Sequence, residues 1–246
     1  MKNIYKYILY IILILISFVS CDRVEYFFSR SYVYSYNDFK DVILVNNKEN
    51  TIAIVYTNIE EQCSMFSKKE KKMLYDSLCI KNNDMSYNKT VLSPYKTHQW
   101  VSQYYAIIPN IINIDIKSEQ DFDDTHIAGE SLNDIIEILS YSPREYIDKN
   151  YQYLYKWNEN SLDTMFYNSC FGDNTVSPVH CTLSELELET LNLIGGWLRN
   201  SYKVSHTIAY LYFTQASTLS KTHNLTVTIT LSDGRVFEKS IEKTFN

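Results

Sequence analysis

The sequence predicts a mainly β protein, an immunoglobulin-like β-sandwich with two or three short helices packed on it. Residues of high β propensity, which are β-branched or aromatic, dominate three regions, at 41–57, 99–116 and 203–245. From Leu225 to Leu231, apolar residues alternate with polar ones, which is the period of a half-buried strand. An α+β domain is the alternative, because the 226 residues after position 20 leave room for more helix.

Residues 1–20 have the organisation of a secretory signal peptide. Two lysines precede a 13-residue apolar run from Tyr7 to Val19, whereas a bilayer-spanning helix needs about 20 apolar residues. The residues at 18–21, Phe-Val-Ser-Cys, resemble a lipobox, in which cleavage leaves Cys21 as the N-terminus and its sulfur receives a diacylglycerol. We therefore predict lipid attachment at Cys21. An uncleaved membrane anchor and an ordinary secreted protein are the alternatives.

The mature chain is divided into a tether and one domain. Residues 21–40 mix aromatic side chains with Ser, Asn and Asp without a clean period, and we interpret them as a lipidated tether that becomes an irregular covering strand. Residues 41–246 are then a single β-rich extracytoplasmic domain. Its first strands, at 41–46 and 51–57, flank a turn-rich stretch and are expected to form a hairpin.

Capping boxes and apolar spacing predict three short helices in this domain. Ser67, followed three residues later by a glutamate, begins a helix over 67–78. Ser131 caps a second helix over 131–139, whose apolar residues recur at three and four positions. A third helix over 142–157 begins with Ser-Pro, which places proline at the first helical position.

Two further features fix the expected strand pattern. The region around Pro109 is interpreted as two strands with a bend between them, and 203–214 as one strand. In the C-terminal hairpin, the apolar residues of both strands occupy odd positions and must share a face. A three-residue loop with Gly234 in the left-handed region satisfies this by pairing Ile229 with Phe237.

Four cysteines remain if position 21 is lipidated, an even number in a compartment that permits disulfides: Cys63, Cys79, Cys170 and Cys181. Pairing each cysteine with its neighbour in the sequence closes the shortest loops and is our expectation, with free buried thiols as the alternative. No two of them have the C-x-x-C spacing of a zinc or redox site.

A weak acidic-loop site is the one cluster of potential ligands, and it consists of Glu119, Asp121, Asp123 and Asp124. A calcium loop beginning at Asp121 would need glycine at position 126 and a bidentate glutamate at position 132. The sequence has His126 and Leu132 there, so we expect no metal and interpret the segment as a solvated loop.

Composition excludes several classes of function. The formal net charge of −6 and a pI near 5.4 argue against nucleic-acid binding. The common motifs for nucleotide binding, zinc proteolysis and serine hydrolysis are absent from the sequence, so no cofactor is expected. The 22 tyrosines could suggest a sugar-stacking surface, but a genome rich in A and T is the favoured explanation.

Two segments carry a resemblance to a known family. Residues 114–118, 121–123 and 126–134 resemble the central segment of uncharacterised lipoproteins common in Bacteroides and relatives. Residues 223–234 are similar to the closing hairpin of the same family. The resemblance implies a lipid-anchored cell-envelope protein of unknown function, an outer-membrane location on the periplasmic or surface face, and no catalytic residues to carry over.

The expected function is that of a non-catalytic binding or structural module, whose partner would be a glycan, a peptide or a protein. A hydrolase acting on envelope polymer or glycan is the alternative, with Glu119 and Asp124 as its acid and base.

Overall fold

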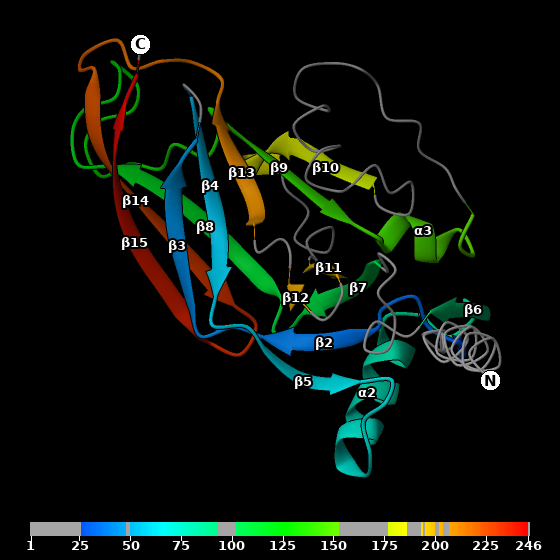
Figure 1. Cartoon of the computed structure of the whole chain (residues 1–246). Coiled ribbons are helices and arrows are strands. Elements are labelled where there is room, and N and C mark those ends of the chain that lie inside the picture. Colours follow the sequence, from blue (N-terminus) through cyan, green and yellow to red (C-terminus); the bar gives the residue numbers. More distant parts are fainter. Residues whose placement is uncertain are drawn as a thin grey trace, which may run out of the picture.

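The computed structural model describes residues 26–47, 50–92, 102–152, 177–185, 193, 195–199, 202–203 and 207–245. Within these residues the strands form four sheets, accompanied by two α-helices and one 3-10 turn (Figure 1). The predicted mainly β architecture with few helices is therefore confirmed. The predicted signal peptide and Cys21 lie outside the described residues, and within those residues no helix is long and apolar enough to cross a bilayer.

Two of the sheets enclose the main core. The five-stranded sheet has the order β10 (Ser177–Thr182), β9 (Ile136–Ser142), β13 (Thr207–Phe213), β4 (Thr51–Thr57) and β3 (Asp41–Asn46). The three-stranded sheet consists of β15 (Val236–Thr244), β14 (Thr222–Leu231) and β8 (Ile111–Ser118). Apolar side chains from both sheets pack into one cluster, which we call the sandwich core and which includes Ile52, Ile138, Leu211 and Ile229.

Both predicted hairpins are present, and the C-terminal one has the expected pairing. In β3–β4, Asp41 lies opposite Thr57. In β14–β15, Ile229 lies opposite Phe237, and the Gly234 N–H donates to the Leu231 carbonyl at 3.0 Å. Gly234 has φ +89, the left-handed conformation that the three-residue loop requires. The pattern of odd-numbered apolar residues was therefore sufficient to set the register.

The edge strand β15 lies against β3 and is linked to it by side chains. Lys239 forms an ion pair with Asp41 at 2.8 Å. Lys243 is buried, and its Nζ donates to the carbonyls of Thr51 at 3.1 Å and Asn47 at 3.3 Å. These bonds join the two sheets of the sandwich along one side, although no strand pairing crosses there in the described residues.

A second region extends the sandwich. Its five-stranded sheet has the order β12 (Tyr202–Lys203), β11 (Gly195–Arg199), β7 (Ser102–Ile107), β2 (Ser35–Asp38) and β5 (Glu60–Ser64). Around it lie α2 (Glu70–Lys81), α3 (Arg144–Asp148) and a small sheet of β1 (Tyr26–Ser29) with β6 (Lys89–Leu92). The 3-10 turn η1 (Leu183–Glu185) follows β10, and its Leu183 packs in the sandwich core. Five buried tyrosines dominate its core, which we call the tyrosine cluster: Tyr36, Tyr75, Tyr104, Tyr146 and Tyr151.

The predicted tether is wrong from residue 26 onward. Strand β2 lies between β5 and β7 in the second sheet, and Tyr34, Tyr36 and Phe39 are buried. These aromatic side chains fill the two cores, so the folded domain begins at β1 rather than at residue 41.

Two of the three predicted helices differ from the structure. Residues 136–142 form strand β9, because pairing with both β10 and β13 overrides the helical spacing of the apolar residues. The helix expected over 142–157 is only the five-residue α3, with Asn150 and Tyr151 at positive φ beyond its end. The helix begins at Arg144 with Pro143 as its N-cap and no side-chain cap, so proline is not at the first helical position as predicted, although Ser142 Oγ accepts from the Arg144 N–H at 3.1 Å. Residues 153–157 lie outside the described part of the chain.

The remaining helix begins later than predicted, and one predicted strand is divided into two. Helix α2 begins at Glu70, and Ser67 instead accepts from the Ser64 N–H at 2.9 Å, so the predicted capping box is not formed. Residues 203–214 do not form one strand, because β12 and β13 belong to different sheets. The bend at Pro109 likewise separates β7 and β8 into different sheets.

Candidate functional site

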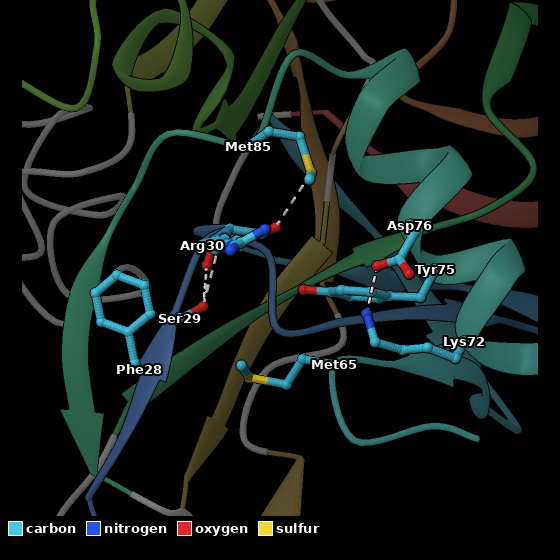
Figure 2. Close-up of a pocket in the computed structure, with 9 residues that line it drawn as sticks. Phe28, Ser29, Arg30, Met65, Lys72, Tyr75, Asp76 and Met85 are labelled. Carbon is cyan, nitrogen blue, oxygen red and sulfur yellow. Dashed lines mark hydrogen bonds and ion pairs between the residues drawn. The ribbon is translucent and has the colours of Figure 1, made fainter.

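A cavity of about 550 Å³ lies between strand β1 and helix α2 (Figure 2). Strand β1 and the residues after it form one wall, α2 forms the opposite wall, and two methionines contribute apolar surface. The lining residues are Phe28, Ser29, Arg30, Ser31, Met65, Lys72, Tyr75, Asp76 and Met85.

Alternation along β1 explains how its residues contribute. Phe27 packs against the sandwich core and Ser29 is buried, whereas Phe28 is exposed at the cavity. Ser29 Oγ donates to the Ser31 carbonyl at 2.5 Å, and Ser31 Oγ contacts the Met85 sulfur at 4.0 Å. This short hydrogen-bonded turn holds Arg30 between two buried serines at the edge of the cavity.

Helix α2 presents a buried side chain and an ion pair to the same cavity. Tyr75 is 3% exposed and donates its hydroxyl to the Val33 carbonyl at 2.7 Å, and burial raises the pKa of that hydroxyl. Lys72 and Asp76, one helical turn apart, form an ion pair at the cavity. Tyr75 thus links the helix to the segment between β1 and β2.

The buried carboxylate of Asp84 fixes the same segment from behind. Asp84 accepts from the backbone N–H of Tyr32 at 2.7 Å and of Val33 at 2.8 Å, and from the Tyr151 hydroxyl at 2.9 Å. Burial raises the pKa of Asp84, and the three hydrogen bonds oppose that rise. The network connects the end of α2, the β1–β2 segment and the residues after α3, so the cavity wall is preorganised.

The cysteines near the cavity are structural thiols. Cys63 and Cys79 are both buried in the tyrosine cluster and are free, so the expected disulfide between them is not formed. The Tyr36 hydroxyl instead contacts the Cys79 sulfur at 4.0 Å, and burial raises the pKa of Cys63 to about 11. A protonated, enclosed thiol is a poor nucleophile. Cys181 is also free, and its expected partner Cys170 lies outside the described residues.

The acidic loop is a separate, hydrogen-bonded structure in which Phe122 inserts into the sandwich core. Asp123 accepts from the hydroxyl and the N–H of Thr125 and from the N–H and Nδ1 of His126, at 2.7 to 2.9 Å. His126 Nε2 lies 3.1 Å from the carboxylate of Asp134. Asp121 accepts from the Ala128 N–H at 2.8 Å.

These contacts shift the pKa values of Asp123 and His126. The Thr125 hydroxyl and His126 hold the pKa of Asp123 well below its usual range. Burial lowers the pKa of His126, but its hydrogen bonds to Asp123 and Asp134 outweigh burial and raise it. The described residues contain no group of three or more His, Cys, Asp or Glu side chains arranged for a metal. The carboxylates of Asp121 and Asp123 are hydrogen-bonded to groups of the loop itself.

The structure does not bring the predicted acid–base pair into the cavity. Glu119 and Asp124 are exposed on the acidic loop, and neither lines the space between β1 and α2. Among the described residues, Asp76 is the single carboxylate in the cavity lining, and it pairs with Lys72. Hydrolysis with two positioned carboxylates therefore has no geometric support at this cavity.

The five tyrosines of the tyrosine cluster serve the core rather than an exposed sugar platform. All five members of the tyrosine cluster are buried, and ring pairs such as Tyr146–Tyr151, with centroids 5.6 Å apart, pack edge to face. Interpretation of 21–40 as a tether concealed the cavity residues of β1. The available sequence signal was the alternation of the large side chains Phe28 and Arg30 with Ser29 and Ser31, which are small.

No family model, no curated protein and no solved structure matches this chain. The resemblance to Bacteroides-type lipoproteins thus stays a prediction, and the function has to be argued from the site itself.

Proposed function

We propose that this chain is a lipid-anchored protein of the cell envelope, located at the outer membrane. Its domain is a non-catalytic binding module with a ligand site in the cavity between β1 and α2. The apolar run that ends at Cys21 supports the anchor, because its length suits a signal peptide better than a membrane span.

The position of the cavity carries the proposal. Four residues separate Cys21 from Tyr26, the first residue of β1, and a fully extended chain of this length spans at most about 18 Å. The cavity is lined by that same strand. A ligand held there would be kept within a short distance of the membrane, which is what a lipid anchor on a binding module achieves.

The cavity chemistry favours binding over catalysis. Phe28, Met65 and Met85 offer apolar contact, and Arg30 and Lys72 supply two positive charges against the one carboxylate of Asp76. This combination suits a ligand with an apolar part and an acidic group, such as an acidic glycan or peptide.

Lipid attachment is tested by metabolic labelling with palmitate in a bacterial host that processes lipoproteins. We expect the wild-type chain to incorporate label and to sediment with membranes, and Cys21→Ala to lose both properties. Cys181→Ala is the matched control and should behave as wild type. A Cys21→Ala protein that remains labelled would refute the anchor.

Ligand binding is tested by thermal shift of the detergent-purified chain against a panel of neutral and acidic oligosaccharides and peptides. An acidic compound should stabilise the wild type. Arg30→Ala should weaken the affinity obtained from the thermal shift about tenfold, as loss of a charged hydrogen bond does. Lys117→Ala, an exposed lysine on β8, is the control. Hydrolysis of a panel compound, or equal binding by both variants, would contradict a binding site at this cavity.

A further inference from the structure

Exposed aromatic side chains surround the start of the domain. Tyr26 and Phe28 alternate along β1 and are 65% and 59% exposed, although their size normally favours burial. Phe66 is also exposed, and its ring lies 4.8 Å from that of Phe27 on the same strand. Tyr26 and Phe28 therefore form a small apolar surface on one face of β1 next to the predicted anchor, whereas Phe66 lies beside Phe27, whose side chain points to the other face.

Helix α2 continues this surface with apolar and basic side chains. Met73 and Ile80 are 66% and 67% exposed, and a separation of seven residues places them on one face of the helix. Residues 67–81 contain five lysines against two acidic residues, a net charge of +3, whereas the whole chain carries −6. This basic segment stands out in an acidic protein.

The two elements belong to the same end of the molecule. Phe28 of β1 and Lys72 of α2 line one cavity, and Figure 2 shows them on opposite sides of it. In Figure 1, α2 and β6, the partner of β1, lie together at the end remote from the C-terminus. Phe28 and Lys72 thus face each other across the cavity.

We infer that this β1–α2 surface docks onto a bilayer of anionic phospholipid, with Tyr26 and Phe28 at the interface and the α2 lysines on the headgroups. The inference rests on the proposed lipid anchor. Aromatic residues favour the boundary between water and lipid, and each lysine near an anionic surface adds to the attraction. The anchor supplies the high local concentration that weak docking needs.

Charge also orients the domain. Because α2 and the residues before it hold a net positive charge, the remainder of the chain is more acidic than the whole and is repelled by an anionic surface. Ile127 and Val236, which are also large, apolar and exposed, lie outside β1 and α2 and serve as controls. Docking would turn the mouth of the cavity toward the headgroups.

The orientation is measured on the acylated full chain in vesicles of phosphatidylglycerol and phosphatidylethanolamine that contain brominated lipid. Tryptophan is introduced as Phe28→Trp or, for control, Val236→Trp, and the emission above wild type is recorded. We expect brominated lipid to quench more than about half of this extra emission at position 28 and little at position 236. Equal quenching at the two positions in membrane-bound, acylated protein would overturn docking and leave the anchor intact.

A second measurement does not depend on acylation. Cys21→Ala chain, expressed without the signal residues, should sediment with phosphatidylglycerol vesicles more than with phosphatidylcholine vesicles, and less at high salt. Adding Lys68→Glu and Lys71→Glu should weaken this binding about tenfold or more, whereas Lys117→Glu with Lys149→Glu, on other elements, should have a smaller effect. Equal loss in both pairs, or no preference for the anionic vesicles, would refute the inference. Loss of palmitate labelling on the wild type would refute the anchor instead.

Discussion

The two cores of this domain achieve burial in different ways. The sandwich core consists largely of Ile, Leu, Val and Phe from two facing sheets, and shape complementarity is the requirement that those residues impose. The tyrosine cluster is built from side chains that each carry a hydroxyl into the interior, together with Cys63 and Cys79. The first core needs its volume filled, whereas the second also needs its polar atoms paired.

Hydrogen bonds in the tyrosine cluster meet this second requirement. Tyr75 donates to the Val33 carbonyl, Tyr104 donates to the Leu193 carbonyl at 2.6 Å, and Tyr151 donates to Asp84. Because each bond has a fixed direction, the cluster specifies the positions of the segments that it joins. Polar bonds therefore position the cavity beside β1, whereas packing holds the sandwich together.

The largest effect should come from a cavity in the sandwich core. Leu211 is fully buried in β13, a strand with neighbours on both sides. Leu211→Ala should lower the free energy of unfolding by about 4 kcal/mol, because lost transfer energy and an unfilled cavity add. Chemical denaturation provides the measurement, with the exposed Leu219→Ala as control. A cost below about 1 kcal/mol would show that this core is loosely packed.

Removal of Asp84 should have the next largest effect, and it tests whether hydrogen bonds hold the region of the tyrosine cluster. Asp84→Ala leaves two backbone N–H groups and the Tyr151 hydroxyl without their acceptor, at a cost of about 3 kcal/mol in unfolding free energy. The exposed Asp148→Ala is the matched control. If Asp84→Ala were as stable as the control, the network would not hold the β1–β2 segment.

Deletion of one hydroxyl sharpens the same point. The Tyr151 hydroxyl donates to Asp84 and accepts from the Ser86 N–H at 3.2 Å, so Tyr151→Phe breaks two bonds without creating a large cavity. We expect a loss of about 2 kcal/mol in denaturant unfolding. Combined with Asp84→Ala, the two changes should cost less than their sum, because they remove a shared bond. Strict additivity would contradict a connected network.

An unpaired hydroxyl in the same region should behave in the opposite way. Ser35 on β2 is fully buried, and its Oγ has no hydrogen-bond partner within the described residues. Ser35→Ala removes a desolvated polar group at nearly constant volume and should raise the free energy of unfolding by about 1 kcal/mol. Buried Ser29, whose Oγ bonds to Ser31, is the control, since Ser29→Ala should destabilise. Destabilisation by Ser35→Ala would reveal a partner for its hydroxyl.

Local pairing was predictable from the sequence, and pairing between distant segments was not. The register of β14 with β15 follows from odd-numbered apolar residues around one glycine. Strand β2, by contrast, pairs with β7 about seventy positions away and carries buried Ser35 and Asn37, so its composition resembles that of a loop. Strand β9 has helical apolar spacing and becomes a strand only because two neighbours pair with it.

The same limit applies to the site. The sequence disfavours a calcium loop because His126 occupies the glycine position, but nothing local indicated that this histidine joins Asp123 and Asp134. The cavity depends on contact between β1 and α2, and its residues are spread from 28 to 85. Only the folded arrangement shows that they belong together.

The hydrogen bonds of His126 with Asp123 and Asp134, at the rim of the sandwich, should contribute least to the free energy of unfolding. They are partly exposed, unlike the buried bonds around Asp84. The raised pKa of His126 means that its stabilisation is fully present below its unfolded pKa of about 6.5 and is lost as the pH rises through the folded pKa. Because Asp134 is 61% exposed, the contribution should be below about 1 kcal/mol. Unfolding of wild type and His126→Gln should therefore differ more near about pH 5.5 than near about pH 8. Asp134→Asn should halve this pH dependence, since it removes one of the two carboxylates that favour the charged ring. A difference that grows with pH would mean that the neutral ring stabilises the loop.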